Sequence, residues 1–257
     1  GLSEMTRLKL PVPPGFTITT EVCNKYYDNN RKLPKDVMPA VMKNIAKMEK
    51  KTGKKWNSTK NPLLVSVRSG AAISMPGMMD TILNLGLNEK TVEGFAKQTK
   101  NPRFSWDSYR RFIQLFGKVV FGVNDEKFDH VLDTAKEKQG VTDDSKLNVE
   151  SLKTIVSKYK KICEEHTKRK FPDTPNEQLV LSIEAVFKSW MGERAIVYRE
   201  KNNITKDIAN GTAVNVVTMV FGNMGDDSAT GVVFTRNGHN GKKEIEGEYL
   251  INAQGED

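Results

Sequence analysis

The sequence contains few of the residues that form disulfide bonds, bind metal ions or act as nucleophiles. It has only two cysteines and three histidines in 257 residues. Cys23 and Cys163 have no C-x-x-C partner, which argues against a disulfide framework and predicts two small buried thiols in a reducing compartment. His130, His166 and His239 form no constellation, and Cys163-x-x-His166 lacks the second pair that a structural zinc site needs.

Long hydrophobic runs are also missing. The longest, such as Val216 to Phe221, are far shorter than the roughly 18 residues that indicate a membrane-spanning helix, and no signal peptide is visible. Because 37% of the residues are hydrophobic and 28% are charged, the chain can bury a sizeable core in one large domain or two. The composition is typical of a soluble enzyme domain.

Three common motifs of enzymes are absent as well. No Gly-Lys-Ser/Thr sequence predicts a Walker-type phosphate loop, and no G-x-G-x-x-G sequence predicts a dinucleotide fold. No G-x-S-x-G elbow accompanies Ser66 or Ser69. The chain therefore offers no nucleophile of its own, and any nucleotide site must be built differently.

The net charge of +8 raises the alternative of a basic nucleic-acid-binding module. Lysines crowd Lys47 to Lys55, Lys158 to Lys161 and Lys168 to Lys170, and such runs can neutralise a phosphate backbone. The first two runs, however, lie on expected helices with apolar opposite faces. Those faces consist of Val37, Val41, Ile45 and Met48, and of Leu152, Ile155, Val156, Tyr159 and Ile162. A solvent-exposed lysine face is therefore favoured over a nucleic-acid site.

The most informative segment that is present runs from Leu63 to Asn88. Its apolar start, Leu63 to Val67, predicts a strand buried on both faces, and Arg68 is expected where that strand ends. Ser69 to Ala72 are small enough to let a ligand approach the backbone closely. A cation beside exposed amide groups suits phosphate.

The second half of this segment predicts a helix. Ser74-Met75-Pro76-Gly77 is interpreted as a helix-entry turn and Met78 to Leu85 as the helix, whose N–H groups would add to the phosphate site. The alternative is a plain connection in which Arg68 pairs with a carboxylate at the core edge. In that case Met75, Met78 and Met79 belong to the core, and Asp80 merely charges the first helical turn.

The hydrophobic pattern divides the chain into three expected parts. Residues 1–98 form an N-terminal α+β lobe, residues 99–193 a helical subdomain, and residues 194–257 a β-rich part. Strands are expected at Phe16 to Thr19, Ala195 to Tyr198, Thr212 to Phe221, Gly231 to Thr235 and Glu248 to Ala253. Helical stripes are expected at Tyr109, Phe112, Ile113, Phe116 and Val120, and at Leu179, Ile183, Phe187 and Trp190.

Several long strings in this order closely resemble the nucleotide-binding domain of the pyruvate, phosphate dikinase family. They are PVPPGFTITTEVCNKYY, SVRSGAAISMPGMMDTILNLGLN, NPRFSWDSYRRFI, GTAVNVVTMVFGN, GVVFTRN and GEYLINAQGED. The resemblance covers essentially the whole chain. It implies an α+β fold of the ATP-grasp type with a helical insertion.

The resemblance also implies roles for individual residues. Arg68 is expected to act in catalysis on the ATP phosphates, with the turn from Ser74 to Met79 over them. The turn contributes Ser74, Pro76, Gly77 and Met78. Val217 and Met219 are expected beside the adenine, where an apolar slot and a polarizable thioether suit a purine ring. Glu256 and Asp257 are expected near the other end of the nucleotide, although they also fit a charged chain end.

Two departures from the family's pattern alter these expectations. Val217 stands where some relatives have a glutamine, so the adenine loses a side-chain hydrogen bond and its recognition must rely on backbone groups. Ala72 replaces a second arginine found in some relatives. Arg68 is therefore expected to carry more of the charge neutralisation.

The resemblance finally implies an intracellular phosphotransferase that uses ATP and Mg²⁺, in the cytosol or in an organelle such as a chloroplast or glycosome. The expected partners are a swivelling phosphohistidine domain and a pyruvate-binding barrel, neither of which this chain contains, in a homodimer at full length. The family's upstream Gly-Lys motif and downstream acidic pair are also missing, so the segment is expected to be inactive alone. Phosphoenolpyruvate synthase and glucan, water dikinase are the alternatives that share this chemistry.

Overall fold

A computed structural model describes residues 1–255 of the chain. The chain divides into two compact units, Gly1–Met219 and Val220–Asp257, and each is described by itself. Among residues 1–255, none of the helices combines the length and the apolar character that a bilayer crossing requires.

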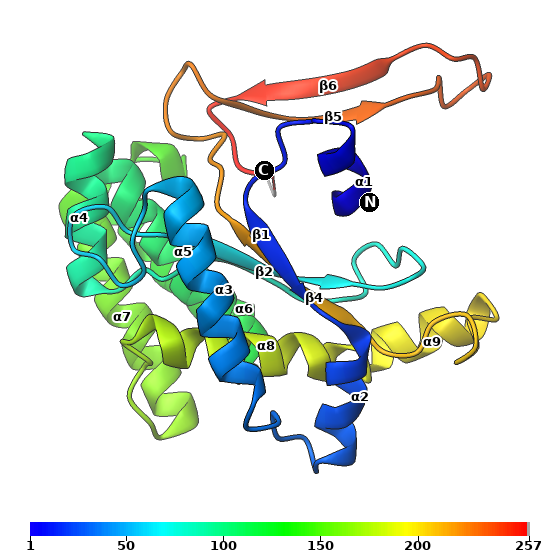
Figure 1. The fold of residues 1–257 in the computed structure, drawn as a ribbon. Coiled ribbons are helices and arrows are strands. Elements are labelled where there is room, and N and C mark those ends of the chain that lie inside the picture. The colour runs from blue at the N-terminus through cyan, green and yellow to red at the C-terminus, as the bar shows by residue number, and fades with distance from the viewer. Residues whose placement is uncertain (256–257) are drawn as a thin grey trace. The chain divides into compact units, whose positions relative to one another are not determined.

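The first unit contains a mixed set of helices and strands (Figure 1). Its helices are α1 (Leu2–Arg7), α2 (Thr20–Asp28), α3 (Val37–Thr52), α4 (Glu89–Thr99), α5 (Pro102–Phe121), α6 (Asp125–Gln139), α7 (Val149–Thr167), α8 (Pro175–Ser189) and α9 (Glu193–Lys201), with a 3₁₀ turn at Asp144–Lys146. Its strands are β1 (Gly15–Ile18), β2 (Val65–Gly70), β3 (Thr81–Leu85) and β4 (Ala213–Thr218). The α+β class expected from the sequence is confirmed.

The four strands form one antiparallel sheet in the order β1-β4-β2-β3. Side chains alternate between the two faces of a strand, so the register assigns each residue to a face. The core face carries Val65, Val67, Val214 and Val216, all fully buried. The opposite face, called the open face below, carries mostly exposed or half-buried residues.

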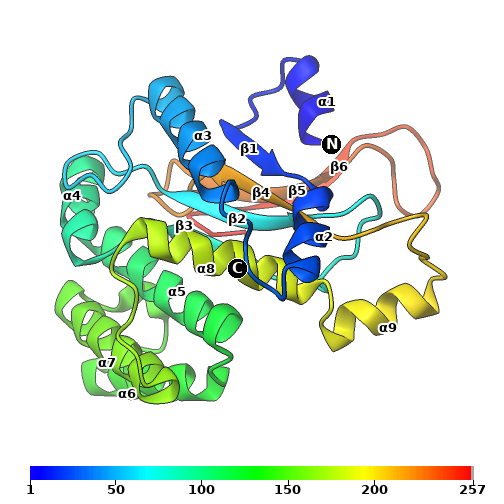
Figure 2. The ribbon, with the colours of Figure 1, turned by 60° about the horizontal axis from the view of Figure 1, so that its bottom comes forward.

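Helix α8 covers the core face. It packs against β2, β3 and β4, and Figure 2 shows it running across the sheet. Leu179, Ile183 and Phe187, from the apolar stripe expected there, are fully buried. Because the helix occupies this face, the side chains on the other side of the sheet are left for a ligand or another part of the protein.

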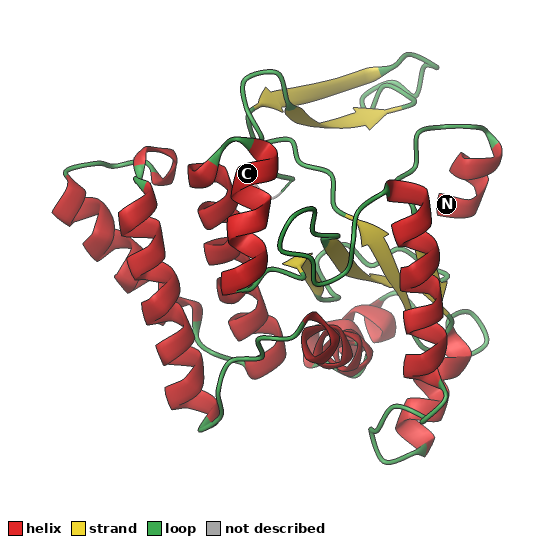
Figure 3. Ribbon diagram, turned by 60° about the vertical axis from the view of Figure 1, so that its left-hand side comes forward, coloured by secondary structure: helices red, strands yellow, loops and turns green. Residues whose placement is uncertain are grey.

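Helices α4 to α7 form a helical layer beside β3 (Figure 3). These helices pack closely at Gly117 of α5, where a Cβ atom would lie 2.8 Å from Sγ of Cys163 in α7 and 2.7 Å from Cζ of Phe128 in α6. Glycine therefore allows the three helices to pack tightly. Both cysteines are buried and unpaired, as expected.

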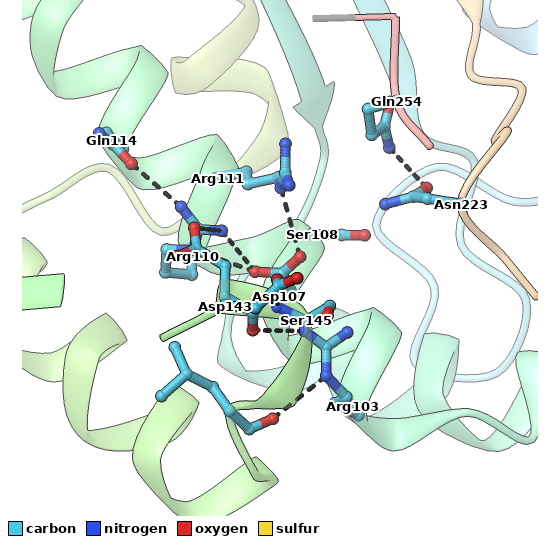
Figure 4. Close-up of polar contacts among 12 residues, drawn as sticks. Arg103, Asp107, Ser108, Arg110, Arg111, Gln114, Asp143, Ser145, Asn223 and Gln254 are labelled. Carbon is cyan, nitrogen blue, oxygen red and sulfur yellow. Dashed lines mark hydrogen bonds and ion pairs between the residues drawn. The ribbon is translucent and has the colours of Figure 1, made fainter. Parts of the chain in front are cut away.

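Helix α5 carries a largely buried ion-pair network (Figure 4). Asp107 accepts hydrogen bonds from Nη2 and Nε of Arg110 at 2.6 and 3.1 Å, and pairs with Nε of Arg111 at 3.3 Å. Tyr109 between them is fully buried. These residues stabilise the fold, and the Arg110 guanidinium is buried and paired with a carboxylate rather than free in solvent.

The second unit is built on a hairpin of β5 (Ala229–Phe234) and β6 (Glu246–Ile251). Neither strand contains a buried residue. After the hairpin, Nε2 of Gln254 donates a hydrogen bond of 2.8 Å to Oδ1 of Asn223 (Figure 4).

Two predicted elements are wrong. Met78 to Leu85 is not a helix: a turn is followed by strand β3, which pairs with β2. Ala195 to Tyr198 is not a strand but part of helix α9. The apolar stripes of α3 and α7 are confirmed, with the lysines Lys47, Lys158 and Lys161 on the exposed side. The division at residues 98 and 193 stays a prediction.

Candidate functional site

The open face carries a row of polar side chains across all four strands. Thr17 of β1 lies opposite Asn215 of β4, Asn215 lies opposite Arg68 of β2, and Arg68 lies opposite Thr81 of β3. Thr17 Oγ1 donates a hydrogen bond of 2.7 Å to Asn215 Oδ1, and Asn215 Nδ2 donates one of 3.3 Å to the carbonyl of Ser69. These four residues are called the polar row.

Arg68 is the cation of the polar row. Its side chain is exposed, and Nε donates a long hydrogen bond of 3.4 Å to Ser66 Oγ. No carboxylate of residues 1–255 forms an ion pair with it, so the alternative pairing with a core-edge carboxylate is wrong. Arg68 also lies within β2 rather than at its end. The rigid central part of the sheet therefore presents a guanidinium without a counter-ion among the described residues.

Small residues surround the polar row. Gly70 and Ala213 form the neighbouring pair on one side, and Gly15 lies opposite Val217 on the other. Such residues leave the backbone accessible to a planar or extended ligand. The open face thus combines a positive charge with small neighbouring residues.

Val217 and Arg68 share this face on adjacent strands. Val217 lies opposite Ser66, two residues along each strand from the pair of Asn215 and Arg68, so both pairs are on the same face. Ser66 Oγ donates a hydrogen bond of 3.4 Å to the carbonyl of Val217. Because β4 is a central strand, its N–H and C=O groups are used within the sheet. Val217 therefore offers its half-buried side chain, rather than free backbone groups, to a ligand.

Met219 directly follows β4 and is the last residue of the first unit. Its N–H donates a hydrogen bond of 2.9 Å to the carbonyl of Leu64, and its side chain is only 7% exposed. The backbone at this position is thus tied to the segment that precedes β2.

The segment between β2 and β3 contains a β-turn instead of the expected helix entry. The N–H of Met78 donates a hydrogen bond of 3.2 Å to the carbonyl of Met75, with Pro76 second and Gly77 third in the turn. Gly77 has φ +72°, which is the arrangement of a type II turn. Ser74, Pro76 and Gly77 are exposed. The N–H groups of a helix terminus are therefore not available here.

The methionines of this segment are core residues in part, as the alternative interpretation predicted. Met75 is buried with Trp190 and Ala209, and Met78 and Met79 are half-buried against the same cluster. Asp80 does not begin a helix. Burial raises the pKa of its carboxyl group. The Arg194 guanidinium, whose Nη2 lies 3.5 Å from Oδ1 of Asp80, partly offsets that rise.

Glu256 and Asp257 lie outside the described residues. Residues 1–255 contain no group of three or more His, Cys, Asp or Glu side chains that could hold a metal ion. The described residues therefore offer no preformed set of carboxylate and imidazole ligands for a Mg²⁺ ion.

Three residues of the polar row, Thr17, Thr81 and Asn215, were not predicted from the sequence. The alternation of Val214 and Val216 with Asn215 is a usable signal, because it places Asn215 on the face away from the core. The pairing of Thr17 with Asn215 joins residues 198 positions apart, and no local pattern indicates it.

Comparison with known proteins agrees with the resemblance of the motifs. The family described as "Pyruvate phosphate dikinase, AMP/ATP-binding domain" matches residues 30–257. Proteins named pyruvate, phosphate dikinase are 55% identical in Entamoeba histolytica and 53% identical in Clostridium symbiosum. One named pyruvate, phosphate dikinase 1, chloroplastic, in Arabidopsis thaliana is 49% identical.

These matches cover all of this chain but only part of the relatives. The chain spans 29% of the length of the Entamoeba and Clostridium proteins and 26% of that of the Arabidopsis protein. The family model matches most of the chain, residues 30–257. The chain belongs to the family of pyruvate phosphate dikinase AMP/ATP-binding domains.

Proposed function

We propose that the chain is the ATP-binding part of a pyruvate, phosphate dikinase and that ATP binds on the open face of its sheet. The observation that carries the proposal is the placement of Arg68 and Val217. They come from adjacent strands, lie on one face, and bring a cation and an apolar side chain to the same surface. A nucleotide needs both, because its phosphates are anionic and its base is largely apolar on its faces.

Within this proposal Arg68 binds the phosphates and stabilises the charge that develops on them during transfer. Phosphoryl transfer depends mostly on positioning and charge neutralisation, so an exposed guanidinium on a rigid strand is well suited. The Met75 to Met78 turn presents Ser74, Pro76 and Gly77 toward the phosphates. Val217 and Met219 line the adenine side.

The activity of the whole protein follows from its relatives and is part of the proposal. ATP would give one phosphoryl group to a histidine on a swivelling domain, which passes it to pyruvate to form phosphoenolpyruvate. Inorganic phosphate would take a second phosphoryl group, leaving AMP and pyrophosphate. Any Mg²⁺ would accompany the triphosphate. A pyruvate-binding barrel and a homodimer complete the assembly, in the cytosol or in an organelle such as a chloroplast or glycosome.

The test is ATP binding by the full-length protein with and without the Arg68 guanidinium. Arg68→Ala should weaken ATP binding by about 10- to 100-fold, since a charge-assisted hydrogen bond contributes roughly 1.5–3 kcal/mol. Arg68→Lys should recover part of the loss, because it keeps the charge but not the planar fork. Arg169→Ala, at an exposed position in the loop after α7, is the matched control and should bind normally.

Unchanged ATP affinity in Arg68→Ala, measured by isothermal titration calorimetry, would show that this face is not the phosphate site. Phosphate dependence of ATP–AMP exchange separates this enzyme from phosphoenolpyruvate synthase and glucan, water dikinase. The proposal requires that exchange to depend on inorganic phosphate.

A further inference from the structure

The turn that carries Pro76 and Gly77 is attached to the protein through its flanks. Met75 is 7% exposed and is buried with Trp190 and Ala209. Half-buried hydrophobic residues that pack against these three are Tyr27, Ala71, Met78, Met79, Tyr198 and Ile204. This set is called the Trp190 cluster. It includes both ends of the turn, Met75 and Met78.

The tip of the turn has no such support. A Cβ atom on Gly77 would meet nothing within 4 Å, and Pro76 is exposed. The position of the tip is therefore set by Met75 and Met78 and by the surface on which they rest.

Arg199 of α9 holds Trp190 in place by two contacts. Its Nη1 donates a hydrogen bond of 2.8 Å to the carbonyl of Trp190, and its guanidinium carbon lies 4.0 Å from the centre of the indole ring. A cation over an indole face is attractive, and more so when both groups lose water. The carbonyl contact also satisfies a backbone group at the end of α8, where helical partners are lacking.

A second attachment lies next to Trp190. Ser189 Oγ accepts a hydrogen bond of 3.4 Å from the N–H of Asp80 and lies 3.9 Å from Sδ of Met79. Arg194 Nη2 lies 3.5 Å from Oδ1 of Asp80. The C-terminal end of α8 and the start of α9 thus hold the segment where it enters β3 as well as at the turn.

We propose that Trp190, held by Arg199, is a positioning residue that places the Pro76 and Gly77 turn for the phosphates of ATP. The inference rests on the proposed function, because it takes the turn to contact the nucleotide. Binding is strongest when the contacting backbone is already ordered, since less conformational freedom is lost on binding. Without the indole, Met75 and Met78 lose a packing partner, so the Pro76 and Gly77 tip is held less firmly. Trp190 itself need not touch the nucleotide.

The experiment compares ATP and AMP binding in the full-length protein. Trp190→Ala should weaken ATP binding by about tenfold, or about 1.4 kcal/mol, and should leave AMP binding within about twofold. AMP lacks the outer phosphates that the turn would contact. Trp190→Phe should recover most of the ATP affinity because it refills the cluster. Trp56→Ala, at an indole that bonds Asn176, controls for loss of a tryptophan elsewhere.

Hydrogen exchange supplies a readout that separates positioning from general loss of stability. In Trp190→Ala the amides of residues 74–80 should exchange at least about tenfold faster, while those of α5 stay unchanged. If Trp190→Ala does not fold, Arg199→Lys is measured instead. It keeps the charge but should loosen the stacking and the carbonyl contact, with the same selective loss of ATP affinity.

The two proposals fail in different ways. If ATP binding depends on Arg68 but is unchanged or tighter in Trp190→Ala, or if ATP and AMP affinities fall equally, the positioning role is wrong and the proposed function stands. If the full-length protein binds no ATP, or binds it equally well with Arg68→Ala, the proposed function fails and the positioning role fails with it.

Discussion

A Cβ atom on Gly70 would lie 2.5 Å from Nδ2 of Asn215. The two residues come from neighbouring strands, and the missing side chain of Gly70 leaves room for the Asn215 amide on the open face. That amide bonds both Thr17 and the carbonyl of Ser69. The absence of a side chain at position 70 therefore accommodates the Asn215 amide in this conformation.

Gly70→Ala should lower the free energy of unfolding by about 1 kcal/mol. Asn215 is short and can turn away, so the expected cost is that of its hydrogen bonds rather than of a rigid overlap. Urea unfolding measures the loss. Gly238→Ala, where a Cβ atom would meet nothing within 4 Å, should change stability by less than about 0.5 kcal/mol.

The role of Asn215 can be separated with a double mutant. If Asn215 is the obstacle, Gly70→Ala should cost little in an Asn215→Ala background, so the two effects should not add. Full additivity would mean that the methyl group disturbs something other than this amide.

Gly77→Ala tests the left-handed conformation that the turn gives to this residue. In the turn Gly77 has φ +72°, and a left-handed conformation costs an alanine roughly 1–2 kcal/mol. If φ were negative at this position, the same change would stabilise the protein by about 0.4–1 kcal/mol, because alanine restricts the unfolded chain more than glycine does. We expect a loss of about 1 kcal/mol in urea unfolding, and a gain would contradict the turn.

The failed helix prediction has a physical explanation. Met78, Ile82 and Leu85 have helical spacing, and Pro76 is common in the first turn of a helix. Pro-Gly is equally suited to a type II turn, and β2 supplies a partner for a strand. An irregular register and the positive φ of Asn84 place Ile82 and Leu85 both in the core. Tertiary pairing therefore overrides the local pattern.

The site could be predicted only where the residues of a single strand show a recognisable pattern. The apolar run before Arg68 and the alternation in β4 are visible in the sequence. The polar row is not, because it depends on the order β1-β4-β2-β3, which brings Thr17, Asn215 and Arg68 together from distant segments. Ala195 to Tyr198 has β-favouring residues but lies in α9, whose Arg199 contacts Trp190.

Asp107→Asn should destabilise the protein by about 3 kcal/mol at neutral pH, because it removes the nearest counter-ion of the buried Arg110 and leaves Asp144, which is 3.6 Å away and partly exposed. Burial acts to raise the pKa of Asp107, but Arg110 and Arg111 outweigh it and hold the pKa below the ordinary range. The unfolded chain thus binds more protons. The stabilisation is present above the unfolded pKa of about 3.9 and is lost as pH falls through the folded pKa.

Urea unfolding at pH 7 and at decreasing pH below 4 checks this dependence. The difference between wild type and Asp107→Asn should shrink toward the acid end. Asp133→Asn is the matched control. Asp133 is exposed and pairs with Lys136 at 2.9 Å, so its loss should cost less than about 1 kcal/mol at every pH. A difference for Asp107→Asn that stays constant with pH would rule out the linkage.

Cys163 should resist alkylation in the folded protein. Burial, and to a smaller extent the charge of Glu164, raises the pKa of its thiol to about 12 from an ordinary value of 9.0. Only the thiolate reacts, so a rise of this size reduces the reactive fraction about a thousandfold. The contact of α5 and α7 at Gly117 also blocks access. Iodoacetamide should therefore modify Cys163 at a rate that follows global unfolding.

Ser157→Cys, at an exposed position of the same helix, is the control and should react at once in native buffer. Comparable rates for the two thiols by mass spectrometry would show that α5 and α7 separate without unfolding.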